Sequence, residues 1–344
     1  NGCDIYTTFD ANLMDICETA LRKRLEHTRA DWGCVILMDV HTGEIKAMSN
    51  LDRGDDEQYY EVANHAVIRM EPGSTFKTIS MMAALDDGKV EMDDTIRVYR
   101  NGWSYHGSKH TDAHPADTIY NIRQAMAVSS NIALAKIVTE GYGGSAKKFV
   151  KKLKNMGLCD SVDYTIPGAK QALINVPNDT VTISKMAYGY SVELSPLQML
   201  TFYNGIANDG KMITPLIVKE IRKNGKVIEE FESSVIRSSM CSDATLESIR
   251  ECLHDVVWND TLGTASVNPW GTRKAQSDLV AIAGKTGTAQ ILEKGYSNRR
   301  HRMSFVGYFP EENPQYTCIC VIHGPQWPYD AGMDCGSVVR HIAE

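Results

Sequence analysis

The chain has 344 residues, of which 43% are hydrophobic, and a formal net charge of −7 at neutral pH. This is the composition of an ordinary soluble globular protein with one large or two modest cores, and the acidic balance argues against nucleic-acid binding. No stretch approaches 18 consecutive apolar residues and no repeat or low-complexity linker divides the chain, so we expect one unit over residues 1–344.

The first predicted elements are a helix and a hairpin. Asp10 is a candidate N-cap for a helix over Leu13–His27, which carries apolar residues at helical spacing. The segments Cys34–Asp39 and Glu44–Ser49 are typical of two strands joined by a short turn. A sheet is therefore expected to begin early in the chain.

A serine and a lysine three residues apart open the next predicted helix. Pro72 and Gly73 end the preceding segment, and apolar residues recur with helical spacing from Phe76 onward. Ser74 and Lys77 share one helix face, so the lysine can lie beside the serine hydroxyl and take its proton if burial lowers its pKa. The helix N-terminus adds backbone N–H groups where negative charge builds during acyl transfer. The pattern indicates acyl-serine chemistry.

A cluster of possible zinc ligands follows this helix. A turn-rich loop explains the cluster at least equally well, and short ligand patterns often arise by chance. Acyl-serine chemistry needs no metal, so we predict neither a metal nor a cofactor. The residues are His106, His110, Asp112 and His114.

A small polar island, Ser129-Ser130-Asn131, interrupts the apolar stretch from Ala125 to Leu134. We expect a loop between two helices that brings a hydroxyl and an amide into a cleft. Ser129 is a candidate proton relay, and Asn131 is a candidate to hold the lysine and a substrate amide. An ordinary helix cap is the alternative interpretation.

The Ser-x-x-Lys spacing recurs at Ser145 and Lys148, within a lysine-rich run. Phe149 and Leu153 are among the apolar residues on the opposite face of that segment. A solvated amphipathic helix is the simpler explanation for this second copy.

The sequence Lys285-Thr286-Gly287-Thr288 follows the apolar run Leu279–Ile282 and occurs once in the chain. We expect a strand with a glycine where a ligand backbone comes close. The lysine and the two threonines supply a cation and two hydroxyls suited to a substrate carboxylate, with Lys285 remaining charged.

The remaining segments alternate between helix and strand signals, which predicts an α/β protein of α+β type with an antiparallel sheet covered by helices. Asn224-Gly225 is a strong hairpin turn. Predicted helices lie near Ile119–Ala127, Ile132–Thr139, Pro196–Asn208 and Ala244–Trp258, and predicted strands at Lys219–Arg222, Lys226–Phe231, Val280–Ile291, Met303–Tyr308 and Thr317–His323.

The order Ser-x-x-Lys, Ser-x-Asn, Lys-Thr-Gly is that of penicillin-binding proteins and class A β-lactamases. Over nearly its whole length the chain resembles the transpeptidase domain of a class B penicillin-binding protein, and Glu71–Ser74 favours the division-specific branch. Other similar segments are Asp39–Ile45, Tyr188–Tyr190, Leu194–Gln198, Ala207–Gly210, Leu262–Ala265 and Ser304–Pro310. The chain departs from the pattern at Ser266–Asp278, a longer polar stretch than expected, which we interpret as an extra loop at the cleft rim.

The resemblance implies a fold and a set of residue roles. The fold is that of penicillin-binding proteins and serine β-lactamases, with a mainly helical subdomain. Ser74 would be the nucleophile and Lys77 the general base, with Ser129, Asn131 and Lys285 assisting. Thr286, Gly287 and Thr288 would bind the substrate, and the backbone N–H groups of Ser74 and Thr288 would form the oxyanion hole.

The resemblance also implies a peptidoglycan D,D-transpeptidase that cross-links stem peptides, with a D-Ala-D-Ala donor and an amine acceptor, and that β-lactams inhibit covalently. It implies a role in septal cell-wall synthesis, with a membrane glycosyltransferase and divisome proteins as partners. The chain would be a fragment of a longer protein, anchored at the periplasmic face of the cytoplasmic membrane by an N-terminal helix outside this sequence.

Two kinds of alternative function remain open, namely other acyl-serine enzymes and a binding domain. A class A β-lactamase would need a Glu-x-x-Leu-Asn segment after the second motif, which this sequence lacks, and a class D enzyme would resemble Ser-x-Val there. A D,D-carboxypeptidase is a closer relative, but the segments around Tyr188–Tyr190 and Ser304-Phe305 favour the class B proteins. A β-lactam sensor domain would be acylated only to signal.

Nine cysteines are unusual for an exported protein, because an odd count leaves at least one free thiol. There is no Cys-x-x-Cys pair. Cys318 and Cys320 are two residues apart in a predicted strand and therefore face the same side of it. We interpret most of the nine as small buried apolar side chains.

Overall fold

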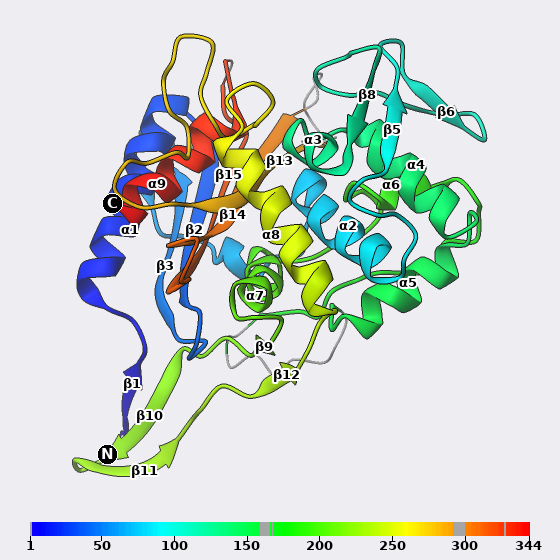
Figure 1. The fold of residues 1–344 in the computed structure, drawn as a ribbon. Coiled ribbons are helices and arrows are strands. Elements are labelled where there is room, and N and C mark those ends of the chain that lie inside the picture. Colours follow the sequence, from blue (N-terminus) through cyan, green and yellow to red (C-terminus); the bar gives the residue numbers. More distant parts are fainter. Residues whose placement is uncertain (1, 159–165, 167, 292–299, 327) are drawn as a thin grey trace.

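A computed structural model describes residues 2–158, 166, 168–291, 300–326 and 328–344. At its centre lies an antiparallel six-stranded sheet with the strand order β13-β14-β15-β2-β3-β4 (Figure 1). The strands are β2 (Trp32–Asp39), β3 (Ile45–Arg53), β4 (Tyr59–Tyr60), β13 (Ala283–Ile291), β14 (Arg300–Phe309) and β15 (Tyr316–His323). The hairpin and the three C-terminal strands predicted from the sequence are thus confirmed, with small shifts at their ends.

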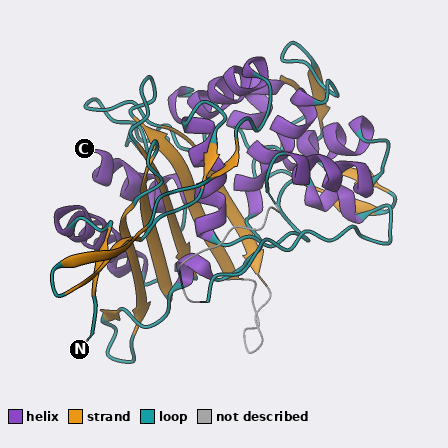
Figure 2. Ribbon diagram, turned by 90° about the horizontal axis from the view of Figure 1, so that it is seen from below, coloured by secondary structure: helices purple, strands orange, loops and turns teal. Residues whose placement is uncertain are grey.

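Helices cover both faces of the sheet, as Figure 2 shows. On one face lie α1 (Ala11–Thr28) and α9 (Ser337–Ala343), and on the other α7 (Pro196–Ala207) and α8 (Asp243–Trp258). In β2, Cys34 and Ile36 belong to the core beneath α7, whereas Val35 and Leu37 belong to the core beneath α1. This two-sided burial explains why β2 is apolar from Trp32 to Met38, and it confirms the predicted architecture.

A mainly helical region lies beside the β13 edge of the sheet (Figure 1). Its first helix, α2 (Phe76–Asp86), is buried along nine consecutive residues from Phe76 to Ala84. The other helices are α3 (Ile122–Ala127), α4 (Asn131–Gly141), α5 (Ala146–Asn155) and α6 (Thr182–Met186). Two small sheets accompany them, β5 (Thr95–Val98) with β8 (Thr118–Asn121) and β6 (Trp103–Tyr105) with β7 (Ser108–His110).

The predicted helix Ile119–Ala127 is wrong in its first three residues, which belong to β8. Helix α3 begins only after Asn121, whose side chain accepts from the Gln124 backbone N–H at 2.8 Å. The Gln124 side chain in turn accepts from the Asn121 backbone N–H at 3.1 Å, which completes a capping box. The capping residues therefore fix the start of the helix.

Other local predictions hold. Asp10 caps α1, since its Oδ1 atom accepts from the backbone N–H groups of Asn12 at 2.9 Å and Leu13 at 3.0 Å. In the hairpin of β10 (Val218–Lys223) and β11 (Lys226–Glu230), Asn224 and Gly225 both have positive φ, 52° and 77°. The chain also contains β1 (Asp4–Thr7) beside β10, and β9 (Met212–Ile213) beside β12 (Val235–Arg237).

The cysteines behave as small apolar residues. Of the eight that the structure describes, all are free and all but Cys3 are buried, which confirms the interpretation for those residues. Cys159 lies outside the described residues.

Within the described ranges, no helix combines the length and the apolar character needed to cross a membrane.

Candidate active site

The N-terminus of α2 lies against β13, the edge strand of the sheet. A 3-10 turn, η2 (Gly73–Thr75), leads into α2 and contacts β13. A Cβ atom on Gly287 would lie 2.9 Å from the Thr75 Cγ2 atom and 2.3 Å from the Ser304 Oγ atom. Any larger residue would force Thr75 or Ser304 to shift, so glycine suits this close approach. We predicted a glycine that admits a ligand backbone, and in the structure its neighbour is the serine-bearing turn of the chain itself.

Two fully buried lysines reach one serine hydroxyl. Lys77 Nζ donates to Ser129 Oγ at 3.0 Å and also to the Ser129 carbonyl oxygen. Lys285 Nζ donates to Ser129 Oγ at 2.8 Å and to the carbonyl oxygen of Thr286 at 3.1 Å. Residues from all three sequence motifs thus converge on Ser129.

Burial changes the acid–base behaviour of both amines. Removal from water lowers the pKa of Lys77 to about 7, although the Asp112 carboxylate acts in the opposite direction. A large share of Lys77 is therefore neutral near pH 7 and able to accept a proton, as a general base must be. Burial, and then the charge of Lys77, lower the pKa of Lys285 well below its usual range. This shift acts against our expectation that Lys285 stays charged, because burial beside a second amine favours the neutral form.

The Ser-x-Asn motif lies at the junction of α3 and α4, as predicted. Ser129 has a φ of 57°, a left-handed conformation that is uncommon outside glycine. Its neighbour Ser130 caps α4, accepting from the Ala133 backbone N–H at 3.0 Å and donating to Asp112 Oδ2 at 2.8 Å. Ser129 therefore faces the lysines, and the helix cap of the alternative interpretation is its neighbour Ser130.

Asn131 and Ser74 lie at the site without the contacts that we expected. Asn131 Nδ2 donates to the Thr111 carbonyl oxygen at 2.8 Å, and the described residues include no hydrogen bond between Asn131 and Lys77. Ser74 is half-buried, and its hydroxyl makes no hydrogen bond within those residues. Catalytic hydrogen bonds often tighten only when substrate binds, so this geometry is compatible with a nucleophile.

The threonines of the third motif differ in exposure. Thr286 is 5% exposed, and its hydroxyl lies 2.6 Å from that of Thr264, whereas Thr288 is exposed. A Cβ atom on Gly73 would lie 3.1 Å from the Thr288 carbonyl oxygen. The backbones that carry Ser74 and Thr288 therefore run side by side, as an oxyanion hole built from their N–H groups requires.

The family profile described as "Penicillin binding protein transpeptidase domain" matches residues 33–344. The chain belongs to the penicillin-binding protein transpeptidase family.

Curated relatives include the peptidoglycan D,D-transpeptidase FtsI homolog of Mesostigma viride, which is 26% identical over 99% of this chain and 60% of the relative. The probable peptidoglycan D,D-transpeptidase PenA of Neisseria flavescens is 27% identical over 99% of this chain and 82% of the relative. This chain spans little more than half the length of several other relatives, such as 54% of PbpB of Mycolicibacterium smegmatis.

Solved structures of similar proteins support the same fold. Penicillin-binding protein 2X of Streptococcus thermophilus has a TM-score of 0.85 at 20% identity, over 99% of this chain and 52% of the other. Penicillin-binding protein 3 of Mycobacterium tuberculosis, complexed with aztreonam, has a TM-score of 0.83 at 23% identity, over 100% of this chain and 78% of the other. The predicted transpeptidase fold is confirmed.

Two of the four candidate zinc ligands of this transpeptidase domain, His110 and Asp112, make other contacts. His110 Nδ1 lies 2.8 Å from the Tyr188 hydroxyl oxygen. Asp112 accepts from the Ile132 backbone N–H at 3.0 Å in addition to its bond with Ser130. Across the described ranges, no three His, Cys, Asp or Glu side chains are arranged to hold a metal ion. Sequence reasoning missed Asp112 as a support of the Ser-x-Asn motif, and no spacing signal pointed to that role.

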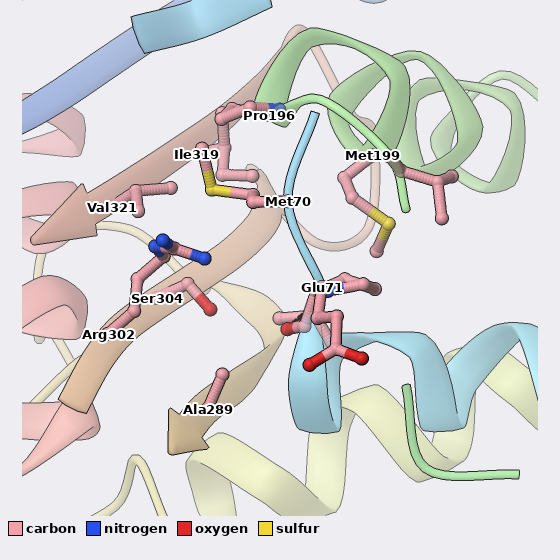
Figure 3. A pocket seen from close by; sticks show the side chains of 12 residues that line it. Met70, Glu71, Pro196, Met199, Ala289, Arg302, Ser304, Ile319 and Val321 are labelled. Carbon is pink, nitrogen blue, oxygen red and sulfur yellow. Dashed lines mark hydrogen bonds between the residues drawn. The ribbon is translucent and has the colours of Figure 1, made fainter. Parts of the chain in front are cut away.

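A small cavity lies on the sheet side of η2, and several of its lining residues are labelled in Figure 3. Met70, Ala289, Arg302 and Ser304 are among them. Its volume of about 20 Å³ holds no more than a water molecule or so. The cavity is therefore too small for the peptide substrate of a transpeptidase.

Proposed function

We propose that this chain is the catalytic domain of a peptidoglycan D,D-transpeptidase that works through an acyl-enzyme on Ser74. The observation that carries the proposal is the pair of buried lysines, Lys77 and Lys285, that meet on the Ser129 hydroxyl beside the Ser74 turn. Family membership and relatives named as D,D-transpeptidases support the same activity.

The first half-reaction forms the acyl-enzyme. Ser74 Oγ attacks the carbonyl carbon of the penultimate D-alanine while its proton passes to neutral Lys77. The backbone N–H groups of Ser74 and Thr288 stabilise the oxyanion, and the C–N bond to the terminal D-alanine then breaks. The departing amine takes a proton from Ser129, which regains one from protonated Lys77. Free D-alanine leaves, and the donor peptide remains as an ester on Ser74.

Binding of the donor depends on its terminal carboxylate. The hydroxyls of Thr286 and Thr288 donate to this anion, and its negative charge favours protonation of Lys285 nearby. In the second half-reaction, the amine of another stem peptide attacks the ester carbonyl. Ser74 regains its proton and an amide cross-link forms, with no net change in charge.

The finer roles rest on the resemblance and on the names of the relatives. Septal synthesis agrees with the FtsI homolog among the relatives, which is only 26% identical. A periplasmic location, an N-terminal anchor, and partnership with a glycosyltransferase and divisome proteins are predictions that the resemblance implies. Acylation by β-lactams agrees with the aztreonam complex of the structurally similar penicillin-binding protein 3.

A thioester analogue of the donor peptide, offered with a D-amino acid as acceptor, tests the proposed activity. We expect a product in which the acyl group is joined to the acceptor amine, with yield rising with acceptor concentration. Because the site is proposed to serve an amine, hydrolysis should be the minor reaction. A sensor domain would be acylated by the thioester once and would not turn over. Release of one equivalent of thiol per protein, with no amide product, would therefore overturn the proposal.

The lifetime of the penicillin adduct separates a transpeptidase from a β-lactamase. After free penicillin is removed, we expect the adduct on Ser74 to persist for many minutes, which corresponds to a deacylation barrier above about 21 kcal/mol. Intact-protein mass spectrometry over time measures this lifetime. Loss within seconds, with steady turnover of penicillin, would favour the β-lactamase alternative.

The two adjacent serines of the second motif are expected to respond differently to alanine substitution. Ser129→Ala removes the hydroxyl shared by the lysines and should slow acylation by at least about 10²-fold, the scale of general acid–base catalysis. Ser130→Ala removes the cap of α4 and should mainly lower stability, by about 1 kcal/mol. Acylation rates and thermal unfolding of both variants measure the difference. Similar kinetic losses in the two variants would argue against a relay role for Ser129.

A further inference from the structure

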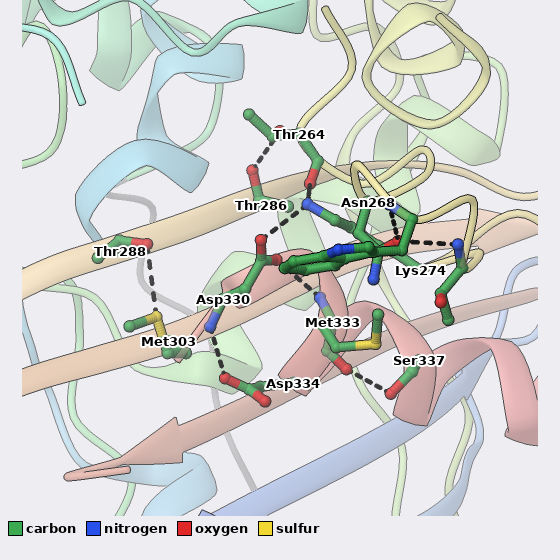
Figure 4. Close-up of polar contacts among 12 residues, drawn as sticks. Thr264, Asn268, Lys274, Thr286, Thr288, Met303, Asp330, Met333, Asp334 and Ser337 are labelled. Carbon is green, nitrogen blue, oxygen red and sulfur yellow. Dashed lines mark hydrogen bonds and ion pairs between the residues drawn. The ribbon is translucent and has the colours of Figure 1, made fainter. Parts of the chain in front are cut away.

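Thr264 contacts the substrate-binding strand although it lies outside all three motifs. It lies in the loop after α8, and its hydroxyl oxygen is 2.6 Å from the Thr286 hydroxyl oxygen (Figure 4). That distance is short for an O–H···O bond and indicates a well-formed contact. Figure 4 also shows Thr288 farther along the same strand. Of the two threonines in the Lys-Thr-Gly-Thr segment, Thr264 therefore lies beside Thr286.

The backbone of Thr264 is fixed on both sides. Its N–H donates to the Ala127 carbonyl oxygen at 3.2 Å, at the end of α3 and two residues before Ser129. Its carbonyl oxygen accepts from Lys274 Nζ at 3.2 Å. Thr264 thus joins the Ser-x-Asn loop to the Lys-Thr-Gly strand.

Lys274 comes from the Ser266–Asp278 stretch, whose role the sequence left open. Its side chain is only 10% exposed, and its Nζ atom pairs with Asp330 Oδ2 at 2.7 Å. The stretch forms the loop predicted from the sequence, and a single antiparallel bridge joins Val267 to Arg273 within it. The nearly buried Lys274, paired with the 46% exposed Asp330 side chain, therefore holds the carbonyl group of Thr264 in place.

The hydroxyl pair has a consequence for substrate binding, because each hydroxyl has one proton to donate. If Thr286 donated to Thr264, it could not also donate to a substrate carboxylate. If Thr264 donates to Thr286, the Thr286 proton is free for the carboxylate, and the chain of hydrogen bonds strengthens that donation. The second arrangement is the one favoured when an anion binds.

We propose that Thr264 is a positioning residue that orients the Thr286 hydroxyl toward the substrate carboxylate, and that Lys274 and Asp330 hold Thr264 in place. This inference rests on the proposed function, since it concerns the carboxylate of the same donor substrate. It assigns the Ser266–Asp278 loop a role in supporting carboxylate recognition from outside the cleft.

Two penicillins test this role, one with a free carboxylate and the other its methyl ester. Thr264→Val removes the hydroxyl and keeps the shape of the side chain. We expect it to slow acylation by the free acid about tenfold, mainly through weaker binding, because the lost interaction supports a charged group. Acylation by the ester should change less than twofold, and Thr264→Ser should restore most of the rate with the free acid.

Thr261→Val is the matched control, because Thr261 is exposed in the same loop and its hydroxyl makes no hydrogen bond within the described part of the chain. Thr264→Ala removes the same hydroxyl with less crowding, should the valine variant unfold. Equal losses with the acid and the ester, or no loss with either, would overturn the positioning role while the proposed function stands. If neither penicillin labels Ser74 in the unmodified chain, the proposed function fails and this inference fails with it.

Discussion

Replacing Ser74 by alanine is expected to abolish the covalent adduct that penicillin forms with this chain. The hydroxyl of Ser74 is the only nucleophile that we propose in this chain, and alanine leaves no oxygen at that position to form an ester. Labelled penicillin should add one acyl group to the unmodified chain, within the peptide that contains Glu71 to Lys77. The same peptide from Ser74→Ala should carry none. Peptide mapping by mass spectrometry makes this comparison.

The chain offers its own control for this experiment. Ser145 and Lys148 repeat the Ser-x-x-Lys spacing, but Lys148 is exposed on α5 and the Ser145 side chain makes no capping bond. Ser145→Ala should therefore label like the unmodified chain. Label that survives Ser74→Ala at its full level would sink the assignment of the nucleophile.

Replacing Lys77 by methionine or arginine is expected to have the second-largest effect, a loss of acylation rate of about 10²- to 10⁴-fold. Arginine keeps a cation but cannot give up its proton, so it cannot serve as the base. It also places a permanent charge in a fully buried position beside Lys285, and it is expected to lower stability as well. Methionine removes the base without burying a charge, so it separates loss of catalysis from loss of fold.

The rate of adduct formation, measured by intact-protein mass spectrometry at limiting penicillin, gives the loss for each variant. Thermal unfolding of the same samples shows which variants remain folded. The same two substitutions at Lys148, the exposed lysine of the second copy, should leave the rate unchanged. A folded Lys77→Met variant that acylates at close to the original rate would show that Lys77 is not the base.

The sequence predicted those parts of the fold that depend on local patterns. Helical spacing and a side-chain cap predicted α1, and the Asn224-Gly225 turn predicted the β10–β11 hairpin. The start of α3 was also predictable, because Asn121 and Gln124 have the spacing of a capping box. The expected helix over Ile119–Ala127 did not use that signal and therefore included three residues of β8.

The site was predictable as a set of residues but not as a geometry. Three ordered motifs identified Lys77, Ser129 and Lys285, yet their spacing carried no information on how deeply the two lysines are buried. The contact of Lys285 with Ser129 spans 156 positions in the sequence. The contact between Thr264 and Thr286 depends in the same way on tertiary packing, which local sequence periodicity does not predict.

The pH dependence of Ser74 acylation tests most directly the claim that burial makes Lys77 a base. The pKa of Lys77 is lowered to about 7, so the neutral form that accepts a proton dominates above that pH and disappears below it. The account predicts that the acylation rate constant for penicillin rises between pH 6 and pH 8, with an inflection near 7, and that Lys77→Met lacks this rise. A flat profile across that range, or a rise that begins only near the ordinary lysine pKa, would contradict it.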